Sequence, residues 1–414
     1  MSFTDLNKID GRTVSFTLKN THVSYANTLR RLILTSVETV GFRADMTPTG
    51  STSDVRVHHN DTAMTNEMLA HRIGLLPIQV KEPMKWNPDR YEFKLDVIND
   101  TDGVRDVVAA DFKVYERGAD STMTEIPSNK FFVPDPLTGD TCLIATLPRG
   151  EKQRISISAR ATLGNGREHA RFIPVSQCSY KYTRDTNPER LKSMFREWLL
   201  HSKKVQLSDL PEGNELHEAF QREFNTMEVD RCFLKDAHDE PISFDFVLET
   251  AGVLDILYIV QRACNLGEAM AGRFATISSG ELLPELSIGP SEGRIIGFDF
   301  LFKGHDHTLG NILQTWLVQN HIEGTSLPRI TYAGYKIPHP LYDEMVLTIG
   351  VQDGQETTAR TAVSVACNGI VNMFRNFYTS WNQINGIVPT KFPKTVAIRR
   401  PASARPTVVS EPRK

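Results

Sequence analysis

The chain has 414 residues, of which 40% are hydrophobic and 23% are charged, and its formal net charge is -3. These values are ordinary for a folded protein with a sizeable core and leave room for two or three domains. Because the chain is nearly neutral, it is no polyanion binder as a whole, and any contact with nucleic acid requires a local basic patch.

The five cysteines are sparse, and the closest two, Cys232 and Cys264, are 32 residues apart. Structural zinc sites show paired ligands at short spacing, so we expect buried thiols in a reducing compartment and neither metal nor cofactor. No apolar run approaches the roughly 18 residues of a membrane span. The start, MSFTDLNKID, lacks the pattern of a signal peptide. We therefore expect an intracellular protein with no membrane contact.

The first clear element is repeated later in the chain. Residues 15–34, SFTLKNTHVSYANTLRRLIL, align without a gap with residues 299–318, DFLFKGHDHTLGNILQTWLV. Both begin with the alternation of a strand that has one buried face and continue with the spacing of an amphipathic helix. The apolar stripes of the two helices predict the residues that pair them: Leu29, Leu32 and Ile33 in the first copy, and Leu309, Ile312, Leu313 and Trp316 in the second. In the first copy the spacing extends the helix to Val37 and Val40.

The turn before the second helix contains His305, Asp306 and His307, which could be half of a metal site. No further ligand group lies at recognisable spacing, so we interpret these residues as a turn that leads into the helix. Thr308, and Ser24 at the matching position, are the expected N-caps, because a hydroxyl there accepts an unpaired backbone N–H.

Residues 48–176 contain short strand-like runs near 55–58, 91–98, 112–115, 142–147 and 154–157, separated by Gly and Pro turns. One helix is expected near 66–74. This segment predicts a mostly β domain. Residues 185–240 follow as a further elaboration, with helices expected near 188–201 and 214–225.

A second repeat joins residues 244–265 to residues 345–368, each a strand, a turn and a helix with the tripeptide Ala-Cys-Asn. The chain is therefore expected to be α+β, with two copies of one unit whose uncovered apolar faces pair as an intramolecular pseudo-dimer. The expected domains are 1–47 with 177–277, an inserted β domain at 48–176, a linker rich in Gly, Pro and Ser at 278–293, a second unit at 294–385, and a tail at 386–414.

The tail carries seven Lys or Arg, one acidic residue and five prolines. This composition is typical of an extended, solvated segment. The alternative is docking on an acidic partner or on nucleic acid.

Five motifs, in order, resemble the α-like subunits of DNA-directed RNA polymerase. Three resemble the third-largest subunit of eukaryotic polymerase II and its archaeal counterpart: NTLRRLIL at 27–34, AHRIGLLPI at 70–78 and GREHARFIPV at 166–175. Two resemble the small eleventh subunit: HTLGN at 307–311 and YAGYKIPHP at 332–340. The presence of both types in one chain resembles fusions found in large cytoplasmic DNA viruses, which implies a virion or host cytoplasm, with the nucleus as the alternative.

The resemblance implies a subunit with no catalytic activity of its own, on which the largest and second-largest polymerase subunits assemble. It implies one copy per polymerase, small partners of the tenth and twelfth types, and contact with DNA only through the complex. It places Arg30, Arg31, His169 and Arg171 near the second-largest subunit, where guanidinium groups suit carboxylate partners. The cysteine-rich metal loop of some relatives is absent, since no cysteine lies between Ile78 and Thr141.

Two other functions compete with this one. A hydrolase using His305, Asp306 and His307 would need further ligands and a base, and no motif supplies them. A nucleic-acid-binding module would depend on the basic tail.

Overall fold

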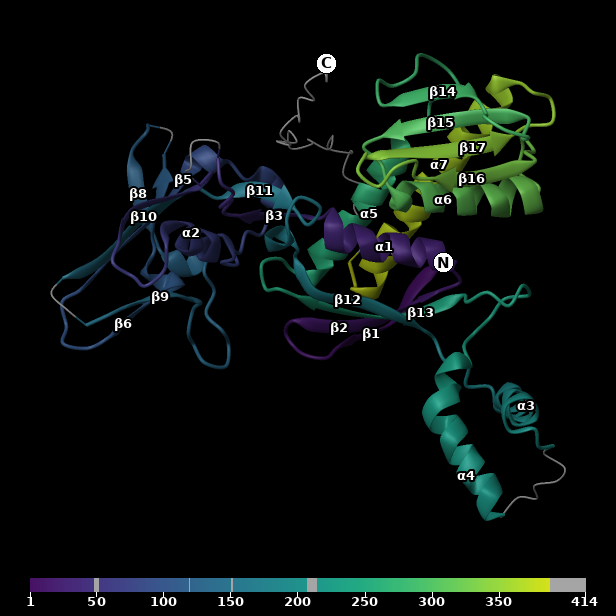
Figure 1. The fold of residues 1–414 in the computed structure, drawn as a ribbon, viewed down its shortest axis with the longest axis horizontal. Helices are drawn as coiled ribbons and strands as arrows, with labels where there is room; N and C mark the ends of the chain where they lie inside the picture. Colours follow the sequence, from purple (N-terminus) through teal and green to yellow (C-terminus); the bar gives the residue numbers. More distant parts are fainter. Residues whose placement is uncertain (48–51, 119, 150–151, 207–213, 388–414) are drawn as a thin grey trace, which may run out of the picture. The chain divides into compact units, whose positions relative to one another are not determined.

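The computed structural model describes residues 1–47, 52–118, 120–149, 152–206 and 214–387. Two compact units emerge (Figure 1). The first is formed by Met1–Ser36 and Val175–Pro389, and the second by Val37–Pro174. Most of the basic tail, from residue 388 on, lies outside the described residues. Within the described ranges, no helix has both the length and the apolar character that crossing a bilayer requires.

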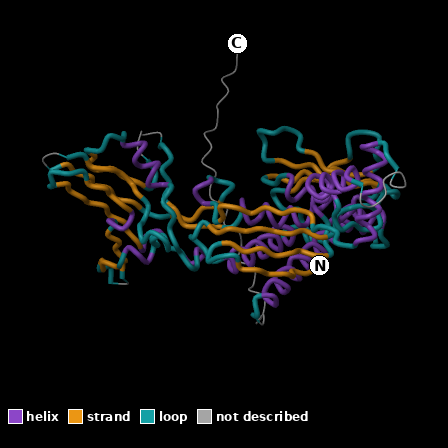
Figure 2. The backbone as a smooth tube through the Cα atoms, turned by 90° about the horizontal axis from the view of Figure 1, so that it is seen from below, coloured by secondary structure: helices purple, strands orange, loops and turns teal. Residues whose placement is uncertain are grey.

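The first half of unit 1 is a four-stranded antiparallel sheet with two helices. Its strands follow the order β1-β2-β13-β12 and appear side by side in Figure 2. The elements are β1 (Ser2–Lys8), β2 (Thr13–Lys19), α1 (Val23–Thr35), β12 (Val175–Tyr182), β13 (Ser243–Thr250) and α5 (Ile256–Gly272). The helix α1 ends at Thr35, so the expectation that it reaches Val37 and Val40 is wrong. Both side chains are buried, and Val40 lies in a strand, β3 (Glu38–Gly41), and in the apolar core of unit 2.

The second half of unit 1 repeats this arrangement, with the sheet order β14-β15-β17-β16. Its elements are β14 (Leu286–Pro290), β15 (Gly297–Lys303), α6 (His307–Leu317), π-helical η10 (Val318–Glu323), β16 (Tyr332–Lys336), β17 (Glu344–Gly350) and α7 (Glu356–Ile384). Both strand–turn–helix repeats predicted from the sequence are confirmed. Each sheet contains two further strands outside these repeats: β1 and β14 form one pair of equivalent edges, and β12 and β16 form the other.

The strand β14 corrects the predicted linker at 278–293. Leu286 and Ile288 lie opposite Phe302 and Phe300 of β15, and Leu286 is buried. Gly289 and Pro290, which favoured a linker, are compatible with an edge strand, because an edge needs no hydrogen bond on its outer side. The connection between the halves is therefore shorter than the sequence suggests.

Helices of the two halves pack on one another between the two sheets (Figure 1). The helix α1 contacts α6, and α5 contacts α7 along much of its length. Aromatic side chains cross between the halves in both directions. Trp381 of α7 packs against Phe3 and Phe16 of the first sheet, and Phe274, just after α5, packs against Phe302 of the second.

Between β12 and β13 the chain forms a helical hairpin with its own small apolar cluster, which includes Phe195, Leu199, Phe224 and Cys232. Its elements are α3 (Pro188–Trp198), η6 (Leu199–Lys203), α4 (Glu215–Glu223), η8 (Phe224–Glu228) and η9 (Val229–Arg231). The two helices predicted here are confirmed. Both continue into a π-helical turn.

Unit 2 is mostly β, as expected, with sheets in the orders β4-β10-β5-β7-β8, β11-β3 and β6-β9. One apolar cluster of large side chains, Phe42, Phe93 and Phe112 among them, forms its core. The helix predicted at 66–74 is confirmed. The strands are β3 (Glu38–Gly41), β4 (Val55–Asn60), β5 (Tyr91–Asn99), β6 (Arg105–Val108), β7 (Lys113–Arg117), β8 (Met123–Ile126), β9 (Leu143–Leu147), β10 (Gln153–Ala159) and β11 (Thr162–Asn165), and the helices are α2 (Asn66–Gly74), η1 (Pro83–Lys85), η2 (Pro88–Arg90), η3 (Ala109–Asp111), η4 (Ser128–Lys130) and η5 (Ala170–Phe172).

Candidate functional site

The N-termini of α1 and α6 are capped by residues that the sequence did not single out as caps. His22 Nδ1 accepts the backbone N–H of Ser24 at 3.1 Å, and Asp306 Oδ1 accepts that of Thr308 at 2.8 Å. The predicted caps, Ser24 and Thr308, are therefore wrong by two residues. A capping side chain accepts a hydrogen bond from a backbone N–H in the first turn of the helix. Here Ser24 and Thr308 supply that N–H, and the residue two positions earlier supplies the acceptor.

This cap also explains the His-Asp-His turn. The Asp306 carboxylate accepts the backbone N–H that caps the helix. His307 Nδ1 lies 3.2 Å from the Tyr335 hydroxyl. The His305 ring packs against Phe274, with 5.3 Å between the ring centroids. In the part of the chain that the structure describes, no three His, Cys, Asp or Glu side chains gather closely enough to hold a metal ion. The turn therefore acts as a helix start that packs against the other half.

Because the caps lie elsewhere, the hydroxyls of Ser24 and Thr308 point across the interface of the two halves. Thr315 Oγ1 donates to Ser24 Oγ at 3.0 Å, and Arg31 Nε donates to Thr308 Oγ1 at 2.9 Å. In the gapless alignment Ser24 matches Thr308, and Arg31 matches Thr315. The two bonds are thus one contact made twice, as a twofold interface requires.

The predicted pairing residues divide into core and contact positions. Six are buried in unit 1 with at most 4% exposure: Leu29, Leu32, Ile33, Leu309, Ile312 and Leu313. Trp316 is partly buried, and its ring lies 5.9 Å from that of Tyr25 in α1, while the Tyr25 hydroxyl donates to Gln319 Oε1 at 2.8 Å. Tyr25 and the aromatic residues of α7 are interface residues that the sequence did not indicate. The alignment gave no signal for Tyr25, because Tyr25 matches Leu309 and Trp316 matches Leu32.

Arg30 and Arg31 have different surroundings despite being adjacent. Arg30 Nε bonds the Asn27 side chain 3.0 Å away on the same helix, and Arg30 stays partly exposed. Arg31 faces the other half, where it bonds Thr308 and lies 3.5 Å from Asp306 Oδ2, with 34% of its side chain exposed. Arg31 is therefore part of the interface within the chain and not of an open basic face.

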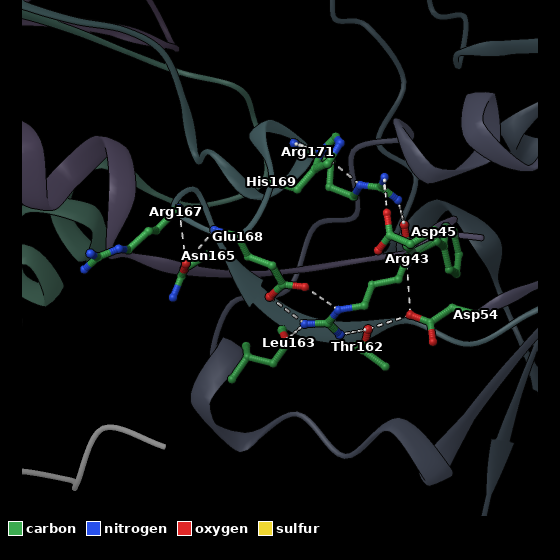
Figure 3. Close-up of polar contacts among 11 residues, drawn as sticks. Arg43, Asp45, Asp54, Thr162, Leu163, Asn165, Arg167, Glu168, His169 and Arg171 are labelled. Atoms are coloured by element: carbon green, nitrogen blue, oxygen red, sulfur yellow. Dashed lines mark hydrogen bonds and ion pairs between the residues drawn. The ribbon is translucent and has the colours of Figure 1, made fainter. Parts of the chain in front are cut away.

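In unit 2, His169 and Arg171 lie in the loop that contains η5 (Figure 3). Arg171 is an internal group with a side chain only 2% exposed. Its Nη1 donates to the Phe42 carbonyl at 2.8 Å, its Nη2 lies 3.3 Å from Asp45 Oδ1, and its Nε donates to His169 Nδ1 at 3.1 Å. All three guanidinium nitrogens are bonded within the unit, so Arg171 holds the loop, and its expected place near the second-largest subunit stays a prediction.

His169 caps η5, since its Nδ1 also accepts the Arg171 backbone N–H at 3.1 Å. Burial, and next the charge of Arg171, lower the pKa of His169 from its ordinary value of 6.5. The imidazole is therefore neutral near pH 7, as an accepting Nδ1 requires. His169 remains partly exposed and is the member of this pair that a partner can reach.

A second arginine fixes the same loop. Arg43 forms a forked pair with Glu168, at 2.5 Å from Nε to Oε1 and 2.8 Å from Nη2 to Oε2, and also bonds Thr162 and the Leu163 carbonyl (Figure 3). Burial lowers the pKa of Arg43, but the hydrogen bond and charge of Glu168 outweigh it and raise the pKa overall. The loop is thus held by two arginines, of which sequence reasoning identified only Arg171.

Comparison with known proteins identifies the class of this fold. Residues 15–266 and, separately, residues 298–380 match the family described as the RNA polymerase Rpb3/Rpb11 dimerisation domain. The chain therefore belongs to this family and contains two such domains.

Relatives support this placement. The DNA-directed RNA polymerase subunit Rpo3 of Methanopyrus kandleri is 33% identical over 43% of this chain and 58% of its own length. The Rpo3 subunit of Pyrococcus furiosus is 26% identical over 63% of this chain and 91% of its own length. Subunit 3B of the Arabidopsis thaliana RNA polymerases IV and V is 25% identical over 61% of this chain and 83% of its own length.

Proposed function

We propose that this chain is a non-catalytic assembly subunit of a multisubunit DNA-directed RNA polymerase. The observation that carries the proposal is the pairing of two Rpb3/Rpb11-type domains inside one chain, through contacts that obey a twofold relation. The relatives are polymerase subunits by name. Because a tether makes the pairing intramolecular, the paired platform does not depend on a partner found in solution.

The platform nucleates association of the largest and second-largest subunits, with one copy per polymerase and with small subunits of the tenth and twelfth types. It touches DNA only through the complex. A source in a large cytoplasmic DNA virus stays a prediction that rests on the fusion of two subunit types.

For the second-largest subunit, we propose Arg30 and His169 as separate contact points, one on each unit. Both are partly exposed, and Arg30 can offer a charge-assisted bond to a carboxylate. Arg31 and Arg171 act differently in this proposal. Arg31 secures the pairing of the halves, and Arg171 holds the loop that presents His169.

The test is a tagged pull-down of the full chain from its native source, followed by mass spectrometry, with a nucleotide-incorporation assay on the isolated chain. The proposal expects the large polymerase subunits in the eluate and no incorporation by the chain alone. A chain that elutes without them and has its own activity would overturn it.

A further inference from the structure

The helices α5 and α7 show how the two halves distinguish each other. Both contain the tripeptide Ala-Cys-Asn, at 263–265 and 366–368, so each position of α5 has a counterpart 103 residues later. Contacts between the two helices should therefore occur in pairs, one the pseudo-symmetric image of the other. Differences within such a pair show what makes the interface unlike a true homodimer.

One contact pair differs in charge. Glu268 Oε1 accepts Arg375 Nε at 2.9 Å and Nη2 at 2.8 Å, and the carboxylate side chain is 11% exposed. The counterparts are Val371 and Gly272, where a Cβ on Gly272 would lie 3.6 Å from Val371 Cγ2. The same geometry thus holds an ion pair on one side and an apolar contact on the other.

The neighbouring contact pair differs in shape. Phe374 is fully buried, and a Cβ on Gly267 would lie 2.5 Å from its ring atoms Cε1 and Cζ. The counterparts are Ile370 and Ala271, both also fully buried. The absence of a side chain at Gly267 on α5 therefore makes room for a large ring on α7, while the image position holds a medium side chain, Ile370, and a small one, Ala271.

We propose that Gly267 and Glu268 on α5, together with Phe374 and Arg375 on α7, determine that the halves pair unlike with unlike. If two first halves paired, Glu268 would face Gly272 and lose its cation, and Gly267 would face Ala271 with the volume of the ring left empty. If two second halves paired, Arg375 would face Val371, and Phe374 would meet Ile370 where Gly267 now leaves room. Loss of the cation beside the largely buried Glu268 disfavours the first of these pairs, and mismatched volume disfavours both; the Arg375 side chain is 47% exposed, so its own charge adds little.

The partner that this surface rejects is a second copy of the same chain. Because the two halves share one fold, like halves of two copies could otherwise pair through the same helices and link chains into larger assemblies. The proposal concerns the pairing itself, so it goes beyond the polymerase role and does not depend on it.

The experiment uses the full chain with a protease site inserted after Gly280, which is exposed and where an added Cβ would meet no other heavy atom within 4 Å. The folded protein is cut, unfolded in urea and refolded, and native mass spectrometry measures like and unlike pairs. The wild type should return unlike pairs. Glu268→Gln with Arg375→Gln should raise the fraction of like pairs by about tenfold or more. Lys203→Gln with Glu223→Gln, which removes an ion pair in the helical hairpin, is the matched control and should leave the fraction unchanged.

A second measurement uses the uncut chain. Arg375→Glu places two carboxylates together and should lower Tm and produce multimers in light scattering, whereas adding Glu268→Arg should restore the wild-type Tm and mass. A fraction of like pairs that does not rise in the amide variant overturns the proposal. Failure of the exchanged charges to rescue Arg375→Glu overturns it as well.

Discussion

Arg31 Nε donates a hydrogen bond to Thr308 Oγ1 at 2.9 Å, joining two helices whose residues are separated by 277 positions in the chain. The contact between Ser24 and Thr315 is related to this bond by the approximate twofold axis between the halves, so the same contact occurs twice. The bond to Thr308 also gives Arg31 a role in the internal interface, while its expected contact with an external partner stays a prediction.

Replacing Arg31 by Glu should therefore destabilise the chain, whereas replacing Arg30 by Glu should not. In Arg31→Glu the new carboxylate faces Asp306, and the bond to Thr308 is lost, so we expect a loss of about 1–2 kcal/mol in unfolding free energy. Arg30→Glu should keep its stability and lose affinity for the second-largest polymerase subunit. Urea unfolding and a binding assay separate the two effects. Equal stability of both variants would argue against the interface role of Arg31.

Leu313→Asp tests the apolar contribution of α6. Leu313 is fully buried, and an unpaired carboxylate there should cost about 4 kcal/mol or more, or prevent folding. The matched control is Leu216→Asp, since Leu216 of α4 is 49% exposed and should tolerate the charge. The measurement is Tm with the oligomeric state by light scattering. A Leu313→Asp chain as stable as the control would show that α6 is misplaced.

Gly74→Ala tests the burial of Arg171. A Cβ at Gly74 would lie 2.7 Å from Arg171 Nη1 and 3.1 Å from the Phe42 carbonyl oxygen, so the guanidinium would have to leave its bond to that oxygen. We expect a loss of about 1–3 kcal/mol. Gly103→Ala is the control, because its nearest neighbour is the Thr101 hydroxyl at 4.0 Å. If both variants unfold at the same denaturant concentration, the close contact at Gly74 does not exist.

The loop at His169 should give the chain a component of pH-dependent stability. The folded state lowers the pKa of His169 below 6.5, so between the two pKa values the unfolded chain binds more protons. The contribution is complete above 6.5 and is lost as pH falls through the folded pKa. His169→Asn keeps a capping acceptor but does not titrate, so the fall in Tm from about pH 8 to about pH 5 should be smaller than in the wild type. The pKa of His22 is also lowered, so the variant His22→Asn measures how much His22 contributes to the pH dependence of Tm. An identical pH profile for wild type and His169→Asn would exclude this role of the loop.

The repeat was readable in the sequence because strand alternation and helical spacing recur in both copies, and the helix predicted at 66–74 has the bounds of α2. Patterns of neighbouring residues failed to predict an element where pairing with a segment distant in the sequence determines its structure. The strand β14 exists because β15 offers an edge to Leu286 and Ile288. The helix α1 does not reach Val40, because Val40 lies in β3 and pairs with Leu163 of β11.

Side-chain roles were less predictable than elements. A basic dipeptide on a helix predicts a solvated face, yet only the fold shows that Arg31 faces α6 while Arg30 does not. Arg171 likewise becomes internal only because Gly74 and the Phe42 carbonyl from distant segments leave space and an acceptor for it. Neither contact has a spacing that a sequence pattern could reveal.

The most direct test of the assembly role is co-expression of the largest and second-largest polymerase subunits with and without this chain, followed by measurement of their association. The account predicts that the two large subunits co-purify only when the chain is present, and that Leu313→Asp abolishes the effect. Equal association of the large subunits in the absence of the chain would contradict it.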